Sequence, residues 1–334
     1  MRIATIDCGT NTVLLLVAEV SGAGQGRPRA VPVEERLEIT RLGQGVDGTG
    51  SLAADAMERT VGVLVGYREV MDRLGVDAGR VRMTATSACR DATNREVFFD
   101  AAEAAVGVRP ELLSGEDEAG LSFAGATADL APALGPFLVF DLGGGSTEVV
   151  LGTAGPEGEV RGALSLDIGC VRLTERFLTA DPPLPEDLTA AISYAQAWLD
   201  DVLRELPEVT EARTAVGLAG TVSAVAAIEQ GLAVRQRQGR RGGQRPGEVG
   251  RVGGQGADIG VLTHECGRLA VGLERLGGQG DRVLGDLLLA ARQVLDLAER
   301  ELPGGVDPVQ PDPVASHGLD VEGAAAAGGH VDQL

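Results

Sequence analysis

As far as residue 230, short apolar runs of strand length alternate with longer segments whose apolar residues recur three and four positions apart. Runs rich in β-branched residues and leucine predict strands. They cover residues 2–7, 13–19, 31–39, 81–86, 111–113, 137–141, 148–151, 160–166 and 216–218. The helical spacing predicts helices over residues 52–74, 94–106, 171–177, 186–206 and 222–230.

The same plan occurs twice in this order of elements. In each copy, a strand, a glycine-bearing turn and a second strand form a hairpin, followed by a third strand, helices and a further strand. A hairpin at this point differs from a Rossmann unit, in which the glycine loop opens a helix. We therefore predict an α/β protein whose two domains, residues 1–126 and 127–302, face a central cleft, where ligand sites usually lie.

The pattern changes after residue 231. Residues 232–260 are rich in glycine, arginine and glutamine, and no aromatic side chain of Phe, Tyr or Trp follows. Only residues 262–276 and 282–301 have a helical pattern, and residues 303–334 have the composition of a flexible tail. The change indicates either a divergent segment or a shift of reading frame in a GC-rich gene.

Length and composition favour a globular protein, because 334 residues with 44% apolar content can bury two sizeable cores. The longest apolar run near the N-terminus, residues 12–20, is strand-sized and lacks a cleavage pattern, so we predict neither a signal peptide nor a membrane span. Four scattered cysteines without a C-x-x-C pair are typical of reduced thiols. We expect a cytoplasmic protein without membrane contact.

Charge narrows the possible ligands. A formal net charge of −20 argues against a nucleic-acid partner, which needs a basic field. The chain contains no lysine, which excludes a P-loop site of the GxxxxGK[ST] type. A phosphate ligand would therefore be bound by backbone amides, a metal ion and individual arginines.

Two turns offer that chemistry, IDCGTNT at residues 6–12 and FDLGGGSTE at residues 140–148. In each, an aspartate leaves a strand and is followed by glycine and a hydroxyl residue, so that backbone N–H groups can approach phosphate while the carboxylate lies near a cation. The candidate metal ligands are Asp7, Asp141 and Glu148, and the candidate phosphate donors are Thr10, Asn11, Gly143, Gly144, Gly145, Ser146 and Thr147. Two ordinary hairpins with glycine turns are the alternative.

Two further segments carry charged candidates. Arg90, in TSACRDATN, follows a predicted strand and could bind phosphate bidentately, or form a salt bridge to Asp91 or Glu96. In SGEDEAG, Ser114 followed by acidic residues is also typical of a helix N-cap.

Together these segments resemble the exopolyphosphatase/guanosine pentaphosphate phosphohydrolase (Ppx/GppA) family. The matching pieces are IDCGTNTVLLLV (6–17), RLGQGVD (41–47), TSACRDATN (86–94), LLSGEDEAGLSF (112–123), FDLGGGSTEVVLG (140–152), DIGCVRLTERF (167–177) and GLAGTVSAVAA (217–227). The resemblance implies an actin-like (ribonuclease H-like) duplicated fold and a phosphohydrolase that depends on Mg²⁺ or Mn²⁺. It also implies cytoplasmic location, inorganic polyphosphate or guanosine pentaphosphate as substrate, and a possible homodimer.

The resemblance also implies residue roles. Glu118 corresponds to the family's general base and Arg90 to its phosphate-binding arginine, and Arg172 is a weaker candidate for lining the path of the polyanion. Gly9, with Thr10 and Asn11, belongs to the first phosphate loop, and Asp7, Asp141 and Glu148 are linked to the metal. The terminal phosphoryl group would lie between the two loops, attacked by water.

The family's pattern is not found after residue 231, where only residues 256–259 resemble the expected continuation. Two other functions therefore stay open. One is a non-catalytic sensor that binds guanosine tetra- or pentaphosphate or polyphosphate, and the other is an ATP-dependent kinase of the same superfold.

Overall fold

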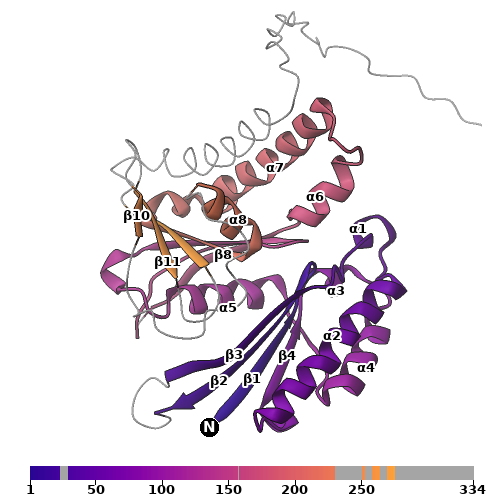
Figure 1. The fold of residues 1–334 in the computed structure, drawn as a ribbon. Coiled ribbons are helices and arrows are strands. Elements are labelled where there is room, and N and C mark those ends of the chain that lie inside the picture. The colour runs from indigo at the N-terminus through magenta and orange to yellow at the C-terminus, as the bar shows by residue number, and fades with distance from the viewer. Residues whose placement is uncertain (23–28, 157, 230–249, 253–257, 264–268, 275–334) are drawn as a thin grey trace, which may run out of the picture. The chain divides into compact units, whose positions relative to one another are not determined.

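The computed structural model describes residues 1–22, 29–156, 158–229, 250–252, 258–263 and 269–274. All of them belong to one compact unit that covers Met1–Leu289. The helix predicted over residues 282–301 and the tail predicted over residues 303–334 lie outside the described residues. The described chain builds two β-sheets with associated helices (Figure 1).

The first sheet has the strand order β3-β2-β1-β4-β5. Its strands are β1 (Arg2–Cys8), β2 (Thr12–Ser21), β3 (Arg29–Ile39), β4 (Val81–Ala85) and β5 (Glu111–Leu112). The predicted hairpin is confirmed, since β2 runs antiparallel to β1, whereas β4 runs parallel to it. The helical segments of this part are α1 (Val46–Thr49), α2 (Ala54–Arg73), a 3₁₀ turn (Ala78–Arg80), α3 (Ser87–Asp91) and α4 (Arg95–Val106).

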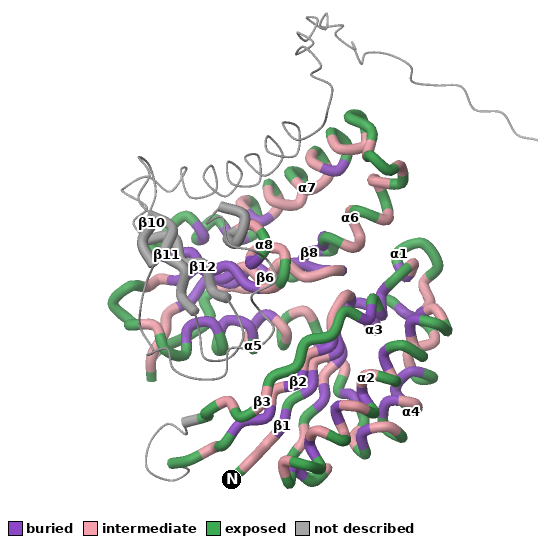
Figure 2. The backbone as a smooth tube through the Cα atoms, viewed as in Figure 1, coloured by how far each residue is buried: buried purple, intermediate pink, exposed green. Residues whose placement is uncertain are grey.

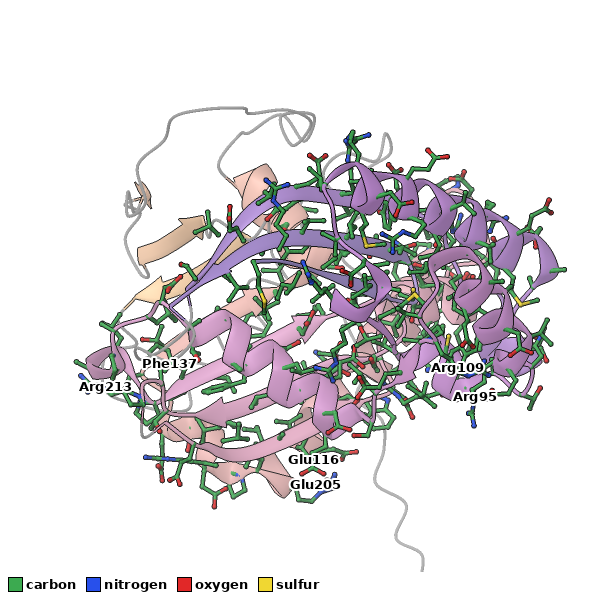
Figure 3. All side chains as sticks on the ribbon, turned by 90° about the horizontal axis from the view of Figure 1, so that it is seen from below. Arg95, Arg109, Glu116, Phe137, Glu205 and Arg213 are labelled. Atoms are coloured by element: carbon green, nitrogen blue, oxygen red, sulfur yellow. The ribbon has the colours of Figure 1, made fainter. Side chains whose placement is uncertain are left out.

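One face of this sheet packs against α2 and α4. Alternate strand residues such as Ile6 and Val13 are buried, and Leu64 and Phe98 from the helices join the same cluster. Figure 2 shows the buried positions recurring along one side of each helix. On the solvent side, Arg109, labelled in Figure 3, forms ion pairs with three acids, which are Glu96, Asp100 and Glu103.

The second sheet has the order β10-β11-β12-β9-β6-β7-β8. Its strands are β6 (Phe137–Leu142), β7 (Thr147–Gly152), β8 (Val160–Leu166), β9 (Thr214–Leu218), β10 (Gly250–Val252), β11 (Asp258–Thr263) and β12 (Leu269–Glu274). Its helical segments are α5 (Gly115–Thr127), α6 (Cys170–Phe177), α7 (Pro185–Glu205), α8 (Ala219–Glu229) and 3₁₀ turns at Pro132–Leu134 and Pro207–Glu211.

The strands β6 to β9 repeat the arrangement of β1 to β4. In both sheets a hairpin is extended by a third antiparallel strand on one side and by a parallel strand on the other. The repeat ends there, because β5 is parallel to β4 whereas β12 is antiparallel to β9. The predicted duplication is therefore observed for the two hairpins that carry the glycine turns.

The helix predicted over residues 262–276 is wrong for the residues that the structure describes. Residues 258–263 and 269–274 are instead the paired strands β11 and β12, with Val261 opposite Val271 in the register. A short apolar run cannot be assigned to helix or strand by periodicity alone, and pairing with β9 favours the strand here.

Helix α5 covers one face of the second sheet. Ala119, Phe123 and Ala126 pack with Phe137 and Val139 of β6, among others. The opposite face packs against α7 through a separate cluster that includes Leu151 and Val202. A domain boundary at residue 126 would count α5 with the first sheet, but its buried face lies on the second.

Candidate active site

A row of polar residues crosses the second sheet where β6 and β7 meet at their glycine turn. Strand register places Asp141 directly opposite Glu148, and Glu148 opposite Ser165 of β8. Residues paired in this way lie on the same face, and here that face is the one covered by α5. On that face of β6, the apolar residues Phe137 and Val139 are followed by the acidic Asp141 near the end of the strand.

Helix α5 packs against this row of polar residues and adds Ser122 to it. Ser122 Oγ donates to Asp141 Oδ2 at 2.7 Å, and Ser165 Oγ donates to Glu148 Oε1 at 2.9 Å. Gly115 permits the contact, since a Cβ at that position would lie 2.5 Å from Ser165 Cβ. Ser114 caps the helix by accepting the Asp117 N–H at 3.0 Å. The N-cap interpretation of SGEDEAG is confirmed, and the same capped first turn carries Glu118.

Arg90 joins three segments that are far apart in the sequence. From α3, its Nη1 donates to Glu118 Oε2 at 2.7 Å and to the Leu113 carbonyl at 3.1 Å. Its Nη2 lies 3.5 Å from Ser146 Oγ, in the second glycine loop, and 4.0 Å from Glu148 Oε1. The structure thus pairs Arg90 with the two glutamates of the site. The alternative partners Asp91 and Glu96 pair with other arginines.

The acids of the site interact strongly with one another. Burial raises the pKa of the Glu118 carboxyl above its ordinary value, as do the charges of Asp7 and Asp141, while Arg90 acts in the opposite direction. Glu148 is only 1% exposed, and burial together with the charge of Glu118 raises its pKa to about 8. Ionisation of all these acids would place more negative charge at the site than Arg90 compensates, and a bound cation would relieve that repulsion.

The first glycine turn is built around backbone contacts. Asp7 ends β1, where it accepts a hydrogen bond from Thr84 Oγ1 at 3.1 Å. The Gly9 N–H closes the turn on the Thr12 carbonyl at 3.0 Å, and the Thr10 and Asn11 carbonyls accept N–H groups from residues 40–43. Gly9 therefore shapes this turn rather than pointing its N–H outward.

The second glycine loop lies directly against the first. A Cβ on Gly144 would approach Thr10 Cβ to 3.1 Å, and one on Gly145 would approach Thr10 Oγ1 to 2.7 Å and Ser87 Oγ to 2.5 Å. A side chain at either position would therefore require Thr10 or Ser87 to shift. Thr147, predicted as a phosphate donor, uses its hydroxyl to bind the Ile168 carbonyl at 2.8 Å and so supports the base of the loop.

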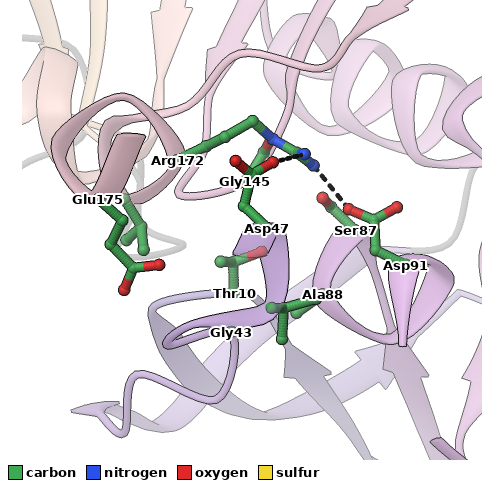
Figure 4. Close-up of a pocket in the computed structure, with 11 residues that line it drawn as sticks. Thr10, Gly43, Asp47, Ser87, Ala88, Asp91, Gly145, Arg172 and Glu175 are labelled. Atoms are coloured by element: carbon green, nitrogen blue, oxygen red, sulfur yellow. Dashed lines mark hydrogen bonds and ion pairs between the residues drawn. The ribbon is translucent and has the colours of Figure 1, made fainter. Parts of the chain in front are cut away.

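Arg172, in α6, is bound on several sides. Its Nε donates to the Gly145 carbonyl at 2.8 Å, its Nη1 to Asp47 at 2.5 Å and its Nη2 to Asp91 at 2.6 Å (Figure 4). A third acid, Asp167, lies 3.8 Å away. The side chain is 13% exposed.

The donors at the site suit a hard divalent cation. Among the residues that the structure describes, no three His, Cys, Asp or Glu side chains form a ready-made metal cluster. Magnesium does not require one, because it usually keeps several waters and binds one or two carboxylates together with substrate phosphates. The predicted ligands Asp7, Asp141 and Glu148 provide only oxygen donors, and their unbalanced charge fits that group.

Comparison with known proteins identifies the chain as a member of a class of phosphohydrolases. A model of the Ppx/GppA phosphatase family matches residues 19–238. Exopolyphosphatase 2 of Mycobacterium tuberculosis is 48% identical over 236 residues, 69% of this chain and 72% of that protein. The guanosine-5'-triphosphate,3'-diphosphate pyrophosphatase of Photobacterium profundum is 32% identical over 227 residues, 67% of this chain and 43% of that protein. The chain belongs to the Ppx/GppA phosphatase family.

Solved structures agree with this assignment. An exopolyphosphatase-like protein matches with a TM-score of 0.61 and 41% identity, over 70% of each chain. The PPX-GPPA enzyme of Aquifex aeolicus matches with a TM-score of 0.55 and 36% identity, over 71% of this chain and 74% of that one. The actin-like duplicated α/β fold is thereby confirmed. Within the described part of the chain, no helix is both long and apolar enough to span a membrane.

Several residues of the site were missed by sequence reasoning. Ser122 lies four residues after Glu118, on the same side of one helix, a spacing that could have indicated it. Asp47 belongs to RLGQGVD, which resembles a family segment but had received no role. Ser165 gives no signal in the sequence, since its position beside Glu148 depends on the register between β7 and β8.

Proposed function

We propose that this chain is an exopolyphosphatase or guanosine pentaphosphate phosphohydrolase, which releases terminal orthophosphate by metal-assisted attack of water. The names of the relatives support this class of substrate, an exopolyphosphatase in one case and a guanosine-5'-triphosphate,3'-diphosphate pyrophosphatase in another. The proposed cofactor is Mg²⁺ or Mn²⁺, held by Asp7, Asp141 and Glu148.

The observation that carries the proposal is the ion pair between Arg90 and Glu118 beside the second glycine loop. Burial raises the pKa of the Glu118 carboxyl, and the Arg90 guanidinium at 2.7 Å opposes that effect by favouring the ionised form. The same guanidinium reaches toward Ser146, so one side chain connects the base to the phosphate loop. A general base must lie within reach of the proton it accepts, and this arrangement positions Glu118 beside the loop.

In the proposed reaction, the loop N–H groups and Arg90 bind the oxygens of the terminal phosphoryl group. Glu118 orients a water molecule for in-line attack and accepts its proton. A bound divalent cation supplies charge neutralisation for the transferring phosphoryl group. Burial of Glu148 and the contact between the two loops limit the water around the reacting group.

The first test is orthophosphate release by the full chain with Mg²⁺, offered short polyphosphate, long polyphosphate and guanosine pentaphosphate in parallel. The Glu118→Gln substitution keeps the size of the side chain and removes the base, so we expect turnover to fall by about 100-fold or more, with substrate binding retained. Calorimetric titration with polyphosphate measures that binding.

Glu116→Gln is the matched control, because Glu116 lies in the same helical turn but is exposed. This variant should retain full activity. Unchanged turnover in Glu118→Gln would contradict the assignment of the base. Binding of substrate without release in the unaltered protein would instead support a non-catalytic sensor.

A further inference from the structure

The N-terminus of α6 donates hydrogen bonds to backbone carbonyls of the second glycine loop. The Cys170 N–H donates to the Gly143 carbonyl at 3.1 Å, and the Val171 N–H donates to the Gly144 carbonyl at 2.9 Å. The third consecutive carbonyl, that of Gly145, accepts the Arg172 side chain at 2.8 Å. Helix α6 and the Arg172 side chain thus bind three successive carbonyls of the loop.

Peptide geometry gives this arrangement a consequence for the loop's donors. In a planar trans peptide, the carbonyl of one residue and the N–H of the next point in opposite directions. Since the carbonyls of Gly143, Gly144 and Gly145 face α6, the following N–H groups, those of Gly144, Gly145 and Ser146, turn away from it. Successive N–H groups turned to one side form an anion-binding nest.

Arg172 also connects this loop to the part of the chain around the first sheet. Its two terminal nitrogens bind Asp47 in α1 and Asp91 in α3 (Figure 4). Asp91 directly follows Arg90, which binds the catalytic candidate Glu118. Through this one guanidinium, the orientation of the Gly145 peptide depends on the position of α3.

The surroundings of Arg172 do not suit a role as a ligand of the polyanion. The pocket beside it, lined by Asp47, Asp91 and Glu175 among others, has a volume of ≈ 20 Å³. That volume holds about one water molecule. Asp167 adds a further negative charge 3.8 Å from the guanidinium. One cation surrounded by these acids does not attract polyphosphate.

We infer that Arg172 is a positioning residue, which holds the Gly145 peptide so that the second loop presents its N–H groups to the terminal phosphoryl group. This inference deepens the proposed function and rests on it for its effect on turnover. Its structural part, the ordering of the loop by Arg172, applies to the free protein as well.

The test compares Arg172→Ala with Arg176→Ala in the full chain. Arg176 is the matched control, since it lies on the same helix and carries the same charge but binds the Tyr194 hydroxyl. Hydrogen–deuterium exchange, read by mass spectrometry without ligand, should be faster in Arg172→Ala than in Arg176→Ala or the unaltered protein at the hydrogen-bonded amides of this contact, those of Gly143, Cys170 and Val171. Segments of α7 should exchange equally in all three, which excludes general unfolding.

Turnover provides the second measurement. Misplacement of a binding group by about 1 Å can cost about 100-fold in rate, so we expect a loss of that order in the kcat of Arg172→Ala and none in Arg176→Ala. Unchanged exchange at the amides of Gly143, Cys170 and Val171 in Arg172→Ala would overturn the inference, whatever the activity of the unaltered protein. If exchange rises but the unaltered protein releases no orthophosphate from any substrate, the loop assignment holds and the proposed function fails.

The Asp91→Asn substitution distinguishes a positioning role of Arg172 from direct substrate binding, because the two roles predict different changes in kcat and KM. If Arg172 positions the loop, the weaker pairing of the guanidinium with a neutral amide should lower kcat in the same direction as Arg172→Ala, and the two losses should be non-additive. If Arg172 instead bound the polyanion, removal of the competing carboxylate would free the guanidinium and lower KM. A lower KM in Asp91→Asn would therefore overturn the inference.

Discussion

Two glycines in α5, Gly115 and Gly120, show how the size of one residue can affect the position of Glu118, the proposed base. A Cβ at Gly115 would lie 2.5 Å from Ser165 Cβ and 2.7 Å from its Oγ. Alanine at this position should push the first turn of α5 away from the row of polar residues and move Glu118. We expect Gly115→Ala to reduce kcat by at least about tenfold, because catalytic groups tolerate little displacement. Steady-state orthophosphate release measures the effect.

Gly120→Ala is the control for this substitution. Gly120 lies in the same helix, but no atom lies within 4 Å of the position where its Cβ would be. Alanine there should stabilise the helix by about 0.5–1 kcal/mol and leave turnover intact. A Gly115→Ala protein that is as stable and as active as Gly120→Ala would show that α5 does not need its close contact with β8.

At the scale of the element, the cap of α5 connects helix stability to the site. Ser114 Oγ accepts the Asp117 N–H at 3.0 Å, within the turn that carries Glu118. Removal of such a cap costs about 1 kcal/mol, so Ser114→Ala should lower the free energy of unfolding by about that amount. Urea denaturation followed by circular dichroism measures it. Ser114→Thr keeps the hydroxyl and should lose much less, and equal losses in the two variants would exclude the cap as the cause.

The elements that could be predicted are those with a strong local pattern. The two hairpins follow from apolar strands around a glycine turn, and their observed register places Asp141 opposite Glu148. Helices α1 and α3 were missed, because four and five residues are too few to show a helical period. Contacts that depend on tertiary structure were not predictable either, such as Arg172 with Asp47, which are 125 residues apart.

At the scale of the whole molecule the protein is acidic, and several acidic residues also gather at the candidate active site. The chain carries a formal net charge of −20, and at the site the charges of Asp7 and Asp141 raise the pKa of Glu118, while the charge of Glu118 raises the pKa of Glu148. Ionisation of all these carboxyls together would be opposed by repulsion, and a bound cation would favour it. Metal binding to the folded state alone should therefore stabilise the protein, by about 2.7 kcal/mol at a metal concentration 100 times Kd.

The prediction for this scale is that Mg²⁺ raises the Tm of the unaltered protein and that chelation by EDTA reverses the shift. Asp141→Asn removes a proposed ligand while keeping its shape, and the Ser122 hydroxyl can still donate to the amide oxygen. Without metal, this variant should be at least as stable as the unaltered protein, since a repulsive charge is gone. With metal, it should need at least about tenfold more Mg²⁺ for the same shift. Glu186→Gln removes an exposed charge in the first turn of α7 and should respond like the unaltered protein. If Asp141→Asn keeps the full shift, Asp141 is not a metal ligand, and the cation must be held by the other carboxylates of the site.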